Sequence, residues 1–328
     1  MAVGERRDDP AIGHRRPQPA APKGRTLTIR HRTVFAYRAP VRLWPHRLML
    51  RPRESPELRL LDFDLEATPE ASLTWAHDVA GNAVATARFA LPAELLVLES
   101  VARLQLDAVV WPVFDVAVEA MSYPFTYAAD DRLDLGALAV PQYPDPAGDL
   151  ARWAHGFVAG PQTDTLALLK DLGAGVHGAL AYVVREDEGT QPPLTTLAAR
   201  SGSCRDFAVL FAEAVRWLGF GARLVSGYLH DPEEELVGAT AAGSTHAWAE
   251  VFVPGAGWIA FDPTNRSVGG AHLVPVAVGR DMRQIVPVRG SFAGPADALD
   301  RLTVEVRVTE RVDDANPRAE STDDTAFG

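Results

Sequence analysis

The only cysteine in this 328-residue chain, Cys204, opens a segment with helical spacing. Apolar residues recur every three or four positions from Phe207 to Leu218, and Gly219 follows directly. This spacing predicts a buried amphipathic helix that starts at Cys204, is capped by the serines before it and stops at Gly219. The positive end of a helix dipole favours the thiolate form of a cysteine placed there. Cys204 is therefore a candidate nucleophile, although a lone cysteine is more often a small buried apolar residue.

A histidine and an aspartate follow in a pattern typical of a strand hairpin. His246 lies in an alternating segment, 245–253, and Asp262 ends a second short segment, 258–262, with proline and glycines between the two. These features predict two antiparallel strands joined by a turn. If the turn centres near Ala256, the two side chains are offset across the hairpin. Direct pairing between them then requires a longer loop or a bulge.

The three residue types fit acyl-transfer chemistry. A thiolate attacks an amide or thioester carbonyl, an imidazole holds and relays the proton, and a carboxylate fixes the imidazole tautomer. Taken alone, His246 is more often a structural histidine, and Asp262 more often a turn residue before Pro263, than a catalytic residue. In this order, Cys204, His246 and Asp262 together indicate a catalytic triad.

The oxyanion that forms in such a reaction needs hydrogen-bond donors. The backbone N–H of Cys204 is the natural first donor, and the side chain of Tyr182 or Gln191, both upstream, is a candidate for the second. We favour Tyr182. An aromatic residue packed in the core beside Leu180 is an equally good interpretation of this tyrosine.

Three further residues flank the candidate site. Trp248 lies two positions after the histidine and is expected to shield it from water. Arg205 and Asp206 directly follow the cysteine and are expected to pair with each other beside the first helical turn. Neither paired cysteines nor a His-Glu-x-x-His or calcium-loop pattern is present in the sequence, so we expect no metal and no cofactor.

Several elements must position these residues. Helical spacing over 150–157 and 166–176 predicts two helices before the cysteine, and 222–229 predicts a strand after its helix. From 25 to about 107 the chain has short β-rich runs broken by turn residues, with Gly81-Asn82 suited to a tight hairpin turn. We therefore divide the chain into a disordered tail (1–24), an N-terminal β-rich domain (25–107), a connecting segment (108–150), a core with a C-terminal extension (151–310) and a disordered acidic tail (311–328).

Composition limits the classes of function. With 47% apolar residues the chain can bury a large core, and its net charge of −11 offers no general attraction to nucleic acid or to an anionic membrane. A single cysteine excludes an intramolecular disulfide and favours a reducing compartment, so we expect a soluble cytoplasmic protein. Arginine pairs at 6–7 and 15–16 give slight support to export, but no apolar segment follows them.

Three sequence blocks resemble the signatures of bacterial transglutaminase-like proteins. They are Gly202-Ser203-Cys204-Arg205-Asp206-Phe207-Ala208, Ser244-Thr245-His246-Ala247-Trp248-Ala249-Glu250-Val251 and Gly257-Trp258-Ile259-Ala260-Phe261-Asp262-Pro263-Thr264-Asn265. The segment 25–107 resembles the β-rich domain that precedes the core in this family, and 278–281 with 287–290 resembles the stretch that follows it. The resemblance implies an α+β, papain-like core with the cysteine helix packed on an antiparallel sheet. It also implies that Cys204, His246 and Asp262 form the triad.

Three classes of function remain open. The chain could be an acyltransferase that joins a glutamine-type amide to an amine, a cysteine protease or amidase that uses water, or a non-catalytic interaction module. The first two share one acyl-enzyme and a protein or peptide substrate, and the first adds a primary amine as co-substrate. The module is least favoured, because a degenerate protein would be free to lose its nucleophile.

Overall fold

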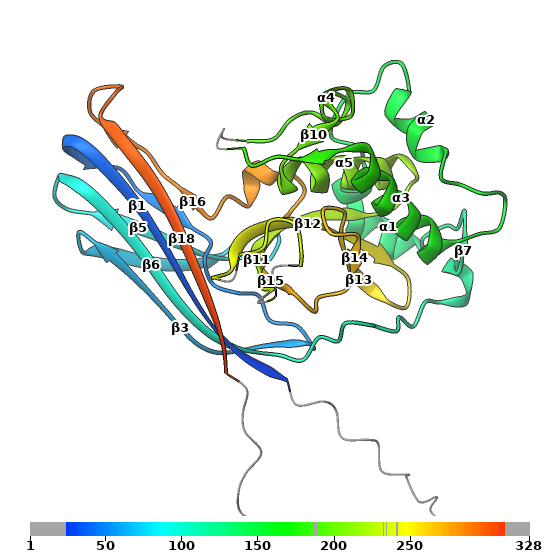
Figure 1. Cartoon of the computed structure of the whole chain (residues 1–328), viewed down its shortest axis with the longest axis horizontal. Coiled ribbons are helices and arrows are strands. Elements are labelled where there is room, and N and C mark those ends of the chain that lie inside the picture. Colours follow the sequence, from blue (N-terminus) through cyan, green and yellow to red (C-terminus); the bar gives the residue numbers. More distant parts are fainter. Residues whose placement is uncertain (1–23, 186–188, 232, 234, 241, 312–328) are drawn as a thin grey trace, which may run out of the picture.

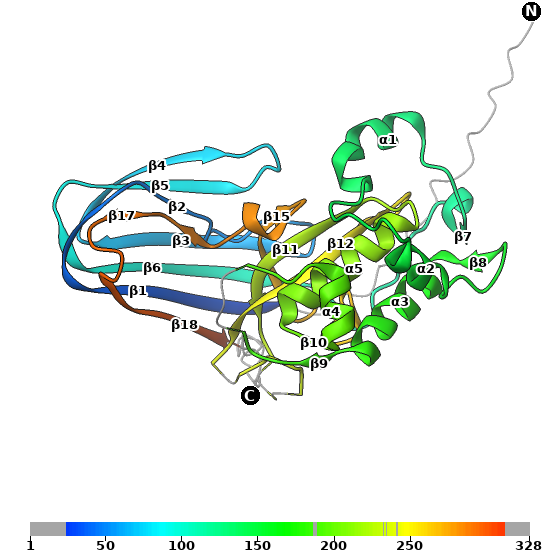
Figure 2. The same cartoon turned by 90° about the horizontal axis from the view of Figure 1, so that it is seen from above.

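The computed structural model describes residues 24–185, 189–231, 233, 235–240 and 242–311. The tails predicted at 1–24 and 311–328 therefore lie almost wholly outside the described residues. The described chain forms three layers: curved N-terminal strands on one side, five helices on the other and a third sheet between them (Figure 1; Figure 2). This third sheet and the helices position the candidate site.

The N-terminal strands form two sheets that pack face to face. The first contains β3 (Leu58–Thr68), β6 (Ala93–Leu106), β1 (Arg25–Leu43) and β18 (Leu299–Arg311), with β17 (Phe292–Ala293) at the end of β1. The second contains β4 (Ala71–His77), β5 (Ala83–Phe89), β2 (His46–Leu48) and β16 (Val288–Arg289). Leu96 and Leu98 from the first sheet and Leu48 and Ala85 from the second are fully buried in one cluster between them. The predicted hairpin joins β4 to β5, with Gly81 at a φ of 73°.

The C-terminal strand β18 returns to the N-terminal sheet. It pairs with β1 in antiparallel register from Thr26 opposite Arg311 to Tyr37 opposite Leu299. The sequence-based division assigned residues up to 310 to the core, whereas the structure places this strand beside the first one. Alternating sequence shows that a segment is a strand, but not which distant strand it joins.

The third sheet carries two of the three candidate triad residues. It has the order β14 (Ser267–Val268), β13 (Gly257–Asp262), β12 (Ser244–Val253), β11 (Ala222–Leu229) and β15 (Leu273–Gly279). On one face Ala249 and Phe261 contact the helices, and on the other Tyr228 and Val274 join Ile29 of β1 in a shared cluster. The sheet is therefore buried on both faces.

The helices cover the outer face of this sheet. They are α1 (Ala129–Leu135), α2 (Asp149–His155), α3 (Thr165–Ala179), α4 (Pro193–Ala199) and α5 (Cys204–Trp217). The shorter elements are η1 (Val118–Ala120), η2 (Gly136–Ala139), η3 (Met282–Gln284), and the paired strands β7 (Ser122–Tyr123) with β8 (Thr163–Asp164) and β9 (Ala181–Tyr182) with β10 (Ser201–Gly202). No helix in the described ranges is both long and apolar enough to span a bilayer.

The cysteine helix α5 is the most deeply buried of the five. Phe207, Phe211 and Val215 lie on its apolar stripe with at most 1% of their surface exposed. The ring of Phe211 lies 5.5 Å from that of Phe261 on β13. Each such side chain contributes roughly 1.5–3 kcal/mol of burial free energy. The predicted α+β fold, with the cysteine helix packed on an antiparallel sheet, is confirmed.

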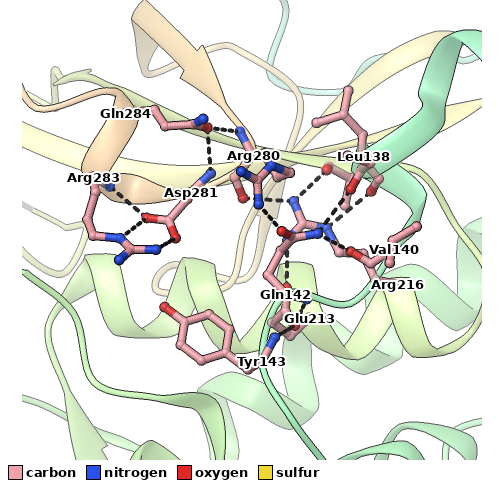
Figure 3. A network of polar contacts seen from close by, with 12 residues as sticks. Leu138, Val140, Gln142, Tyr143, Glu213, Arg216, Arg280, Asp281, Arg283 and Gln284 are labelled. Atoms are coloured by element: carbon pink, nitrogen blue, oxygen red, sulfur yellow. Dashed lines mark hydrogen bonds and ion pairs between the residues drawn. The ribbon is translucent and has the colours of Figure 1, made fainter.

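A buried ion pair fixes the C-terminal half of α5 (Figure 3). Glu213 accepts a 2.6 Å hydrogen bond from Arg216, and both side chains are 1% exposed. The other carboxylate oxygen of Glu213 accepts the backbone N–H groups of Gln142 and Tyr143, at 2.7 and 3.0 Å. Arg216 also donates to the carbonyl oxygens of Leu138, Ala222 and Arg280. We call this set the α5 clamp, because it ties the connecting segment and the end of β15 to the cysteine helix.

Candidate active site

Helix α5 begins at Cys204, as the sequence predicts. Its first turn is closed by Asp206, whose carboxylate accepts both the backbone N–H and the hydroxyl of Ser203, at 2.8 and 2.9 Å. Gly219 follows the helix at a φ of 88°, the left-handed conformation that glycine adopts readily. These contacts leave the thiol of Cys204 partly exposed at the positive end of the helix.

Asp206 has a structural part in this turn. Its fully buried carboxylate accepts two hydrogen bonds from Arg185, at 2.9 and 3.0 Å, and one from the Gln191 backbone N–H at 2.7 Å. Burial by itself would raise the pKa of Asp206, but the hydrogen bonds from Gln191, Ser203 and Arg185 lower it. Within the described residues its ion pair is therefore with Arg185 and not, as expected, with Arg205, which donates to the Arg185 carbonyl.

His246 and Asp262 meet across the β12–β13 hairpin. The Nε2 atom of His246 lies 2.8 Å from Oδ2 of Asp262, and each side chain is 1% exposed. The strands pair regularly from Val253 opposite Gly257 to Ala249 opposite Phe261, so Asp262 is offset from His246 along the sheet. The side chains span this offset, and the bulge or longer loop expected from the sequence is not needed.

The proton on His246 is strongly held. Burial lowers the pKa of this histidine, but the charge and hydrogen bond of Asp262, followed by those of Cys204, outweigh burial and raise it to about 10. His246 thus interacts with Asp262 on one side and with the Cys204 thiol on the other. The structure therefore brings together all three residues predicted as the triad, in the relation that a thiolate–imidazolium pair needs.

Asp262 has two further partners that the sequence analysis did not single out. The side-chain amide of Asn265 donates to Oδ2 at 2.7 Å, and the backbone N–H of Thr264 donates to Oδ1 at 2.9 Å. Burial would raise the pKa of Asp262, but these bonds and the charge of His246 lower it. Asn265 also accepts the Val237 backbone N–H at 2.7 Å. Its position in the third sequence block, three residues after the aspartate, was the available signal.

The structure separates the two candidates for the second oxyanion donor. The ring of Tyr182 lies 6.4 Å from that of Phe207 on the cysteine helix, and the pKa of Tyr182 is raised by burial and then by the charges of Cys204 and Asp262. A Cβ atom added to Gly238 would come within 3.0 Å of the Tyr182 hydroxyl, so segment 235–240 lies against it. The amide of Gln191 instead donates to the Ser201 carbonyl at 3.2 Å and supports the loop before α5.

Trp248 covers one side of the histidine. Its ring stacks on that of His246, with centroids 6.2 Å apart and planes inclined by 24°. The tryptophan is 1% exposed, and a Cβ atom on Gly227 of the neighbouring strand would clash with it at 2.7 Å. Among the described residues, no group of three or more histidine, cysteine or acidic side chains is arranged to hold a metal ion.

Comparisons with known proteins agree with this architecture. Residues 151–263 match the transglutaminase-like superfamily, and residues 27–105 match the bacterial transglutaminase-like N-terminal region. A proposed cysteine protease from Cytophaga hutchinsonii has the same fold, with a TM-score of 0.68 and 18% identity over 92% of this chain and 95% of that chain.

Mycobacterial relatives are more similar in sequence but match only in part. An uncharacterised protein of Mycobacterium leprae is 39% identical over 33% of this chain and 37% of its own length. Another, from Mycobacterium tuberculosis, is 31% identical over 53% of this chain and 55% of its own length. The chain thus spans about a third to about half the length of these relatives. With both parts of the family pattern present in order, and with the fold they imply, this chain belongs to the transglutaminase-like superfamily.

Proposed function

We propose that the protein is a cysteine-dependent enzyme that forms a thioester acyl-enzyme with peptide or amide carbonyls of the glutamine type. The observation that carries the proposal is the contact of a helix-terminal thiol with His246, whose other ring nitrogen lies 2.8 Å from a buried carboxylate. This arrangement supplies a nucleophile, a base and a group that orients the base.

The reaction proceeds in two halves. In the first, the Cys204 thiolate attacks the carbonyl carbon, and the C–N bond breaks as His246 gives its proton to the leaving amine or ammonia. In the second, water or a primary amine gives a proton to His246 and attacks the thioester carbon, which releases the thiol. Water yields hydrolysis and an amine yields acyl transfer. Asp262 keeps the imidazole in place in both its charged and its neutral form.

Two donors are proposed for the oxyanion. The backbone N–H of Cys204 is in the first turn of α5, where N–H groups have no partner within the helix. The hydroxyl of Tyr182 is proposed for the second bond, since the pKa of this tyrosine responds to the charge of Cys204 while the Gln191 amide is already bonded. Removing one oxyanion donor typically lowers kcat by about 10²–10³-fold.

Two other functions compete with this one. A cysteine peptidase would use the same residues and differ only in cutting the main chain, so the products decide between them. A non-catalytic interaction module fits less well. Burying the His246–Asp262 pair costs desolvation free energy, and a protein that does no thiol chemistry would gain nothing from that cost.

The test is a screen of glutamine-containing peptides with and without a primary amine, read by mass spectrometry, with Cys204→Ala as the control. Amine incorporation indicates a transferase, deamidation an amidase and main-chain cleavage a peptidase. A chelator in the assay should change none of these outcomes, since the three residues suffice. Failure of every peptide, combined with a Cys204 thiol that iodoacetamide labels no faster than a free cysteine, would support the interaction module.

We also propose the cytoplasm as the site of action. The proposed nucleophile is the only cysteine and must stay reduced, which a reducing compartment ensures. Cell fractionation with an antibody against the native protein would test this. Recovery in a periplasmic or secreted fraction would contradict it.

A further inference from the structure

A cleft of about 760 Å³ opens between the N-terminal sheet and the start of β12, and none of the three candidate triad residues lines it. One wall is the start of β12, where Ser244 and Thr245 directly precede His246. The other wall is formed by β1 and β18 of the N-terminal sheet. A ligand in this cleft would therefore contact both the N-terminal sheet and the strand that carries the histidine.

The cleft is basic in a protein of net charge −11. Its lining includes Arg30, Arg32 and Arg307 but one acidic residue, Glu305. Glu99 and Glu305 lie within 4.0 Å of Arg30 or Arg32, as partly exposed ion pairs. No acidic side chain of the described residues forms an ion pair with Arg307. The unbalanced positive charge of the cleft is thus on Arg307.

The arrangement of Arg307 is unfavourable without an anion. In the β1–β18 ladder it lies directly opposite Arg30. Like charges in directly opposed positions of an antiparallel pair destabilise the sheet. An acidic ligand between the two guanidinium groups would relieve this repulsion.

The β18 wall also offers backbone groups. β18 is paired on one side by β1, and within the described chain no other strand joins it. The Val308 N–H points away from β1, since it donates to the Ala242 carbonyl. Because the direction alternates along an antiparallel strand, the backbone groups of Val304 and Val306 also point outward, into the cleft that both residues line. Such an open edge pairs readily with an extended chain.

We infer that this cleft binds an extended, acidic segment of the protein or peptide substrate, which adds as a strand to the edge of β18. The backbone of Val304 and Val306 provides main-chain pairing, and Arg307 provides the preference for acidic residues. Thr245, at the other wall, directly precedes His246 on β12. The inference rests on the proposed function in one respect, namely that the ligand of the cleft is the substrate of the enzyme.

Binding can be measured separately from turnover. The Cys204→Ala protein is titrated into a fluorescently labelled extended peptide with glutamate at alternate positions, and into the same peptide with glutamine there instead. We expect the glutamate peptide to bind about fivefold more tightly at low salt and the difference to shrink at high salt. Arg307→Glu should remove the difference, whereas the matched control Arg301→Glu, on the same strand but outside the cleft, should preserve it.

Proline substitutions test the edge pairing. Val304→Pro removes an outward N–H within the cleft, and Leu302→Pro removes one beyond it; the two side chains are similarly exposed, at 49% and 52%. Proline is tolerated on edge strands. Val304→Pro should weaken binding of both peptides about tenfold and Leu302→Pro should not, with melting curves to confirm that both variants fold.

The outcomes separate the two proposals. Equal binding of both peptides, or equal effects of the cleft variants and their controls, would overturn the inference even if the enzyme is active. Selective binding that responds to Arg307→Glu and Val304→Pro, in a protein that forms no acyl-enzyme with any peptide, would support the cleft as an acidic-peptide site and overturn the proposed function.

Discussion

The carboxylate of Asp262 is held by three hydrogen bonds, and its partners explain what it can do. It accepts hydrogen bonds from His246, Asn265 and the Thr264 backbone, all within 2.9 Å. Such a carboxylate stays charged and fixed, so it orients the imidazole and does not take its proton. Its loss should therefore affect the geometry of the site more than the nucleophile itself.

Replacing Asp262 by alanine should slow acylation less than replacing Cys204 by alanine. The thiolate–imidazolium attraction partly maintains itself, so Asp262→Ala should lose about 10²–10⁴-fold, whereas Cys204→Ala should lose all acyl-enzyme. Single-turnover kinetics of the two variants would measure this. Full activity in a folded Asp262→Ala protein would remove the aspartate from the triad, and an unfolded protein would show that its part is structural.

The buried histidine should also make stability depend on alkaline pH. The pKa of His246 is about 10 in the folded protein against an ordinary value of 6.5, so its contribution to stability is complete below pH 6.5 and is lost as pH rises towards 10. Melting temperatures over this range are measured on Cys204→Ala, which removes the thiol's own titration and its share of the shift but keeps the charge and hydrogen bond of Asp262. They should fall more steeply than those of Cys204→Ala combined with His246→Gln. Parallel curves would contradict the raised pKa.

At the scale of elements, the helix and strands that carry the candidate triad were predicted well from the sequence. The strand at 222–229, the hairpin around Pro254 and the start of α5 agree with the structure, because strong alternation, a proline-glycine turn and a cap mark them locally. The strands β1 and β6 were predicted far too short, because polar residues on their buried faces, His31, Thr33 and Ser100, interrupt the alternation. Helices α1 and α4 were missed: α1 lies in the segment interpreted as a connection, and α4 begins at Pro193, in a Pro192-Pro193 dipeptide more typical of a turn.

Two polar contacts of the candidate site could not be predicted from the sequence. The ion pair of Asp206 with Arg185 and the hydrogen bond from Asn265 to Asp262 depend on loops folding back over α5 and β13. Sequence spacing identifies residues that can carry chemistry, whereas choosing among neighbouring polar partners requires tertiary geometry. The preference for Tyr182 remains a prediction about its role, supported by the effect of the Cys204 charge on its pKa.

The α5 clamp offers a test of how the cysteine helix is held. Glu213→Gln should lower the free energy of unfolding by about 3–5 kcal/mol, because it leaves the buried Arg216 without its counter-charge. Asp149→Asn, which breaks the exposed pair with Arg152, should change it by about 0.5 kcal/mol or less. Denaturant titration of both variants measures the contrast. Equal effects would show that the clamp is not needed for stability.

At the scale of the whole molecule, one buried histidine joins the N-terminal sheet to the third sheet. His31 on β1 lies 3.0 Å from the Tyr228 hydroxyl on β11 and 3.0 Å from the Thr33 hydroxyl. Burial lowers the pKa of His31 to about 4, so the folded protein keeps this imidazole neutral. The junction between the two sheets is therefore neutral and fully hydrogen-bonded around this ring.

Acid should weaken this junction. The unfolded chain binds a proton at His31 below pH 6.5 and the folded chain does so only near pH 4, so stability is lost as pH falls through this range. The fall in melting temperature from pH 7 to pH 5 should be smaller in His31→Gln than in the unchanged protein. Burial also lowers the pKa of His46, but this residue is present in both proteins. The difference between their falls in melting temperature therefore reports on His31. An identical fall would show that His31 is already charged in the folded state.

The return of β18 to β1 has a consequence for the order of folding during synthesis. Thr26 pairs with Arg311, so the first sheet cannot gain its last strand until nearly the whole described chain has left the ribosome. The helices and the third sheet, whose strands follow one another closely from 222 to 279, can form before then. The wall of the cleft that we assign to the substrate is therefore completed last. A nascent chain can assemble its thiol, histidine and aspartate before it can hold a substrate segment against β18.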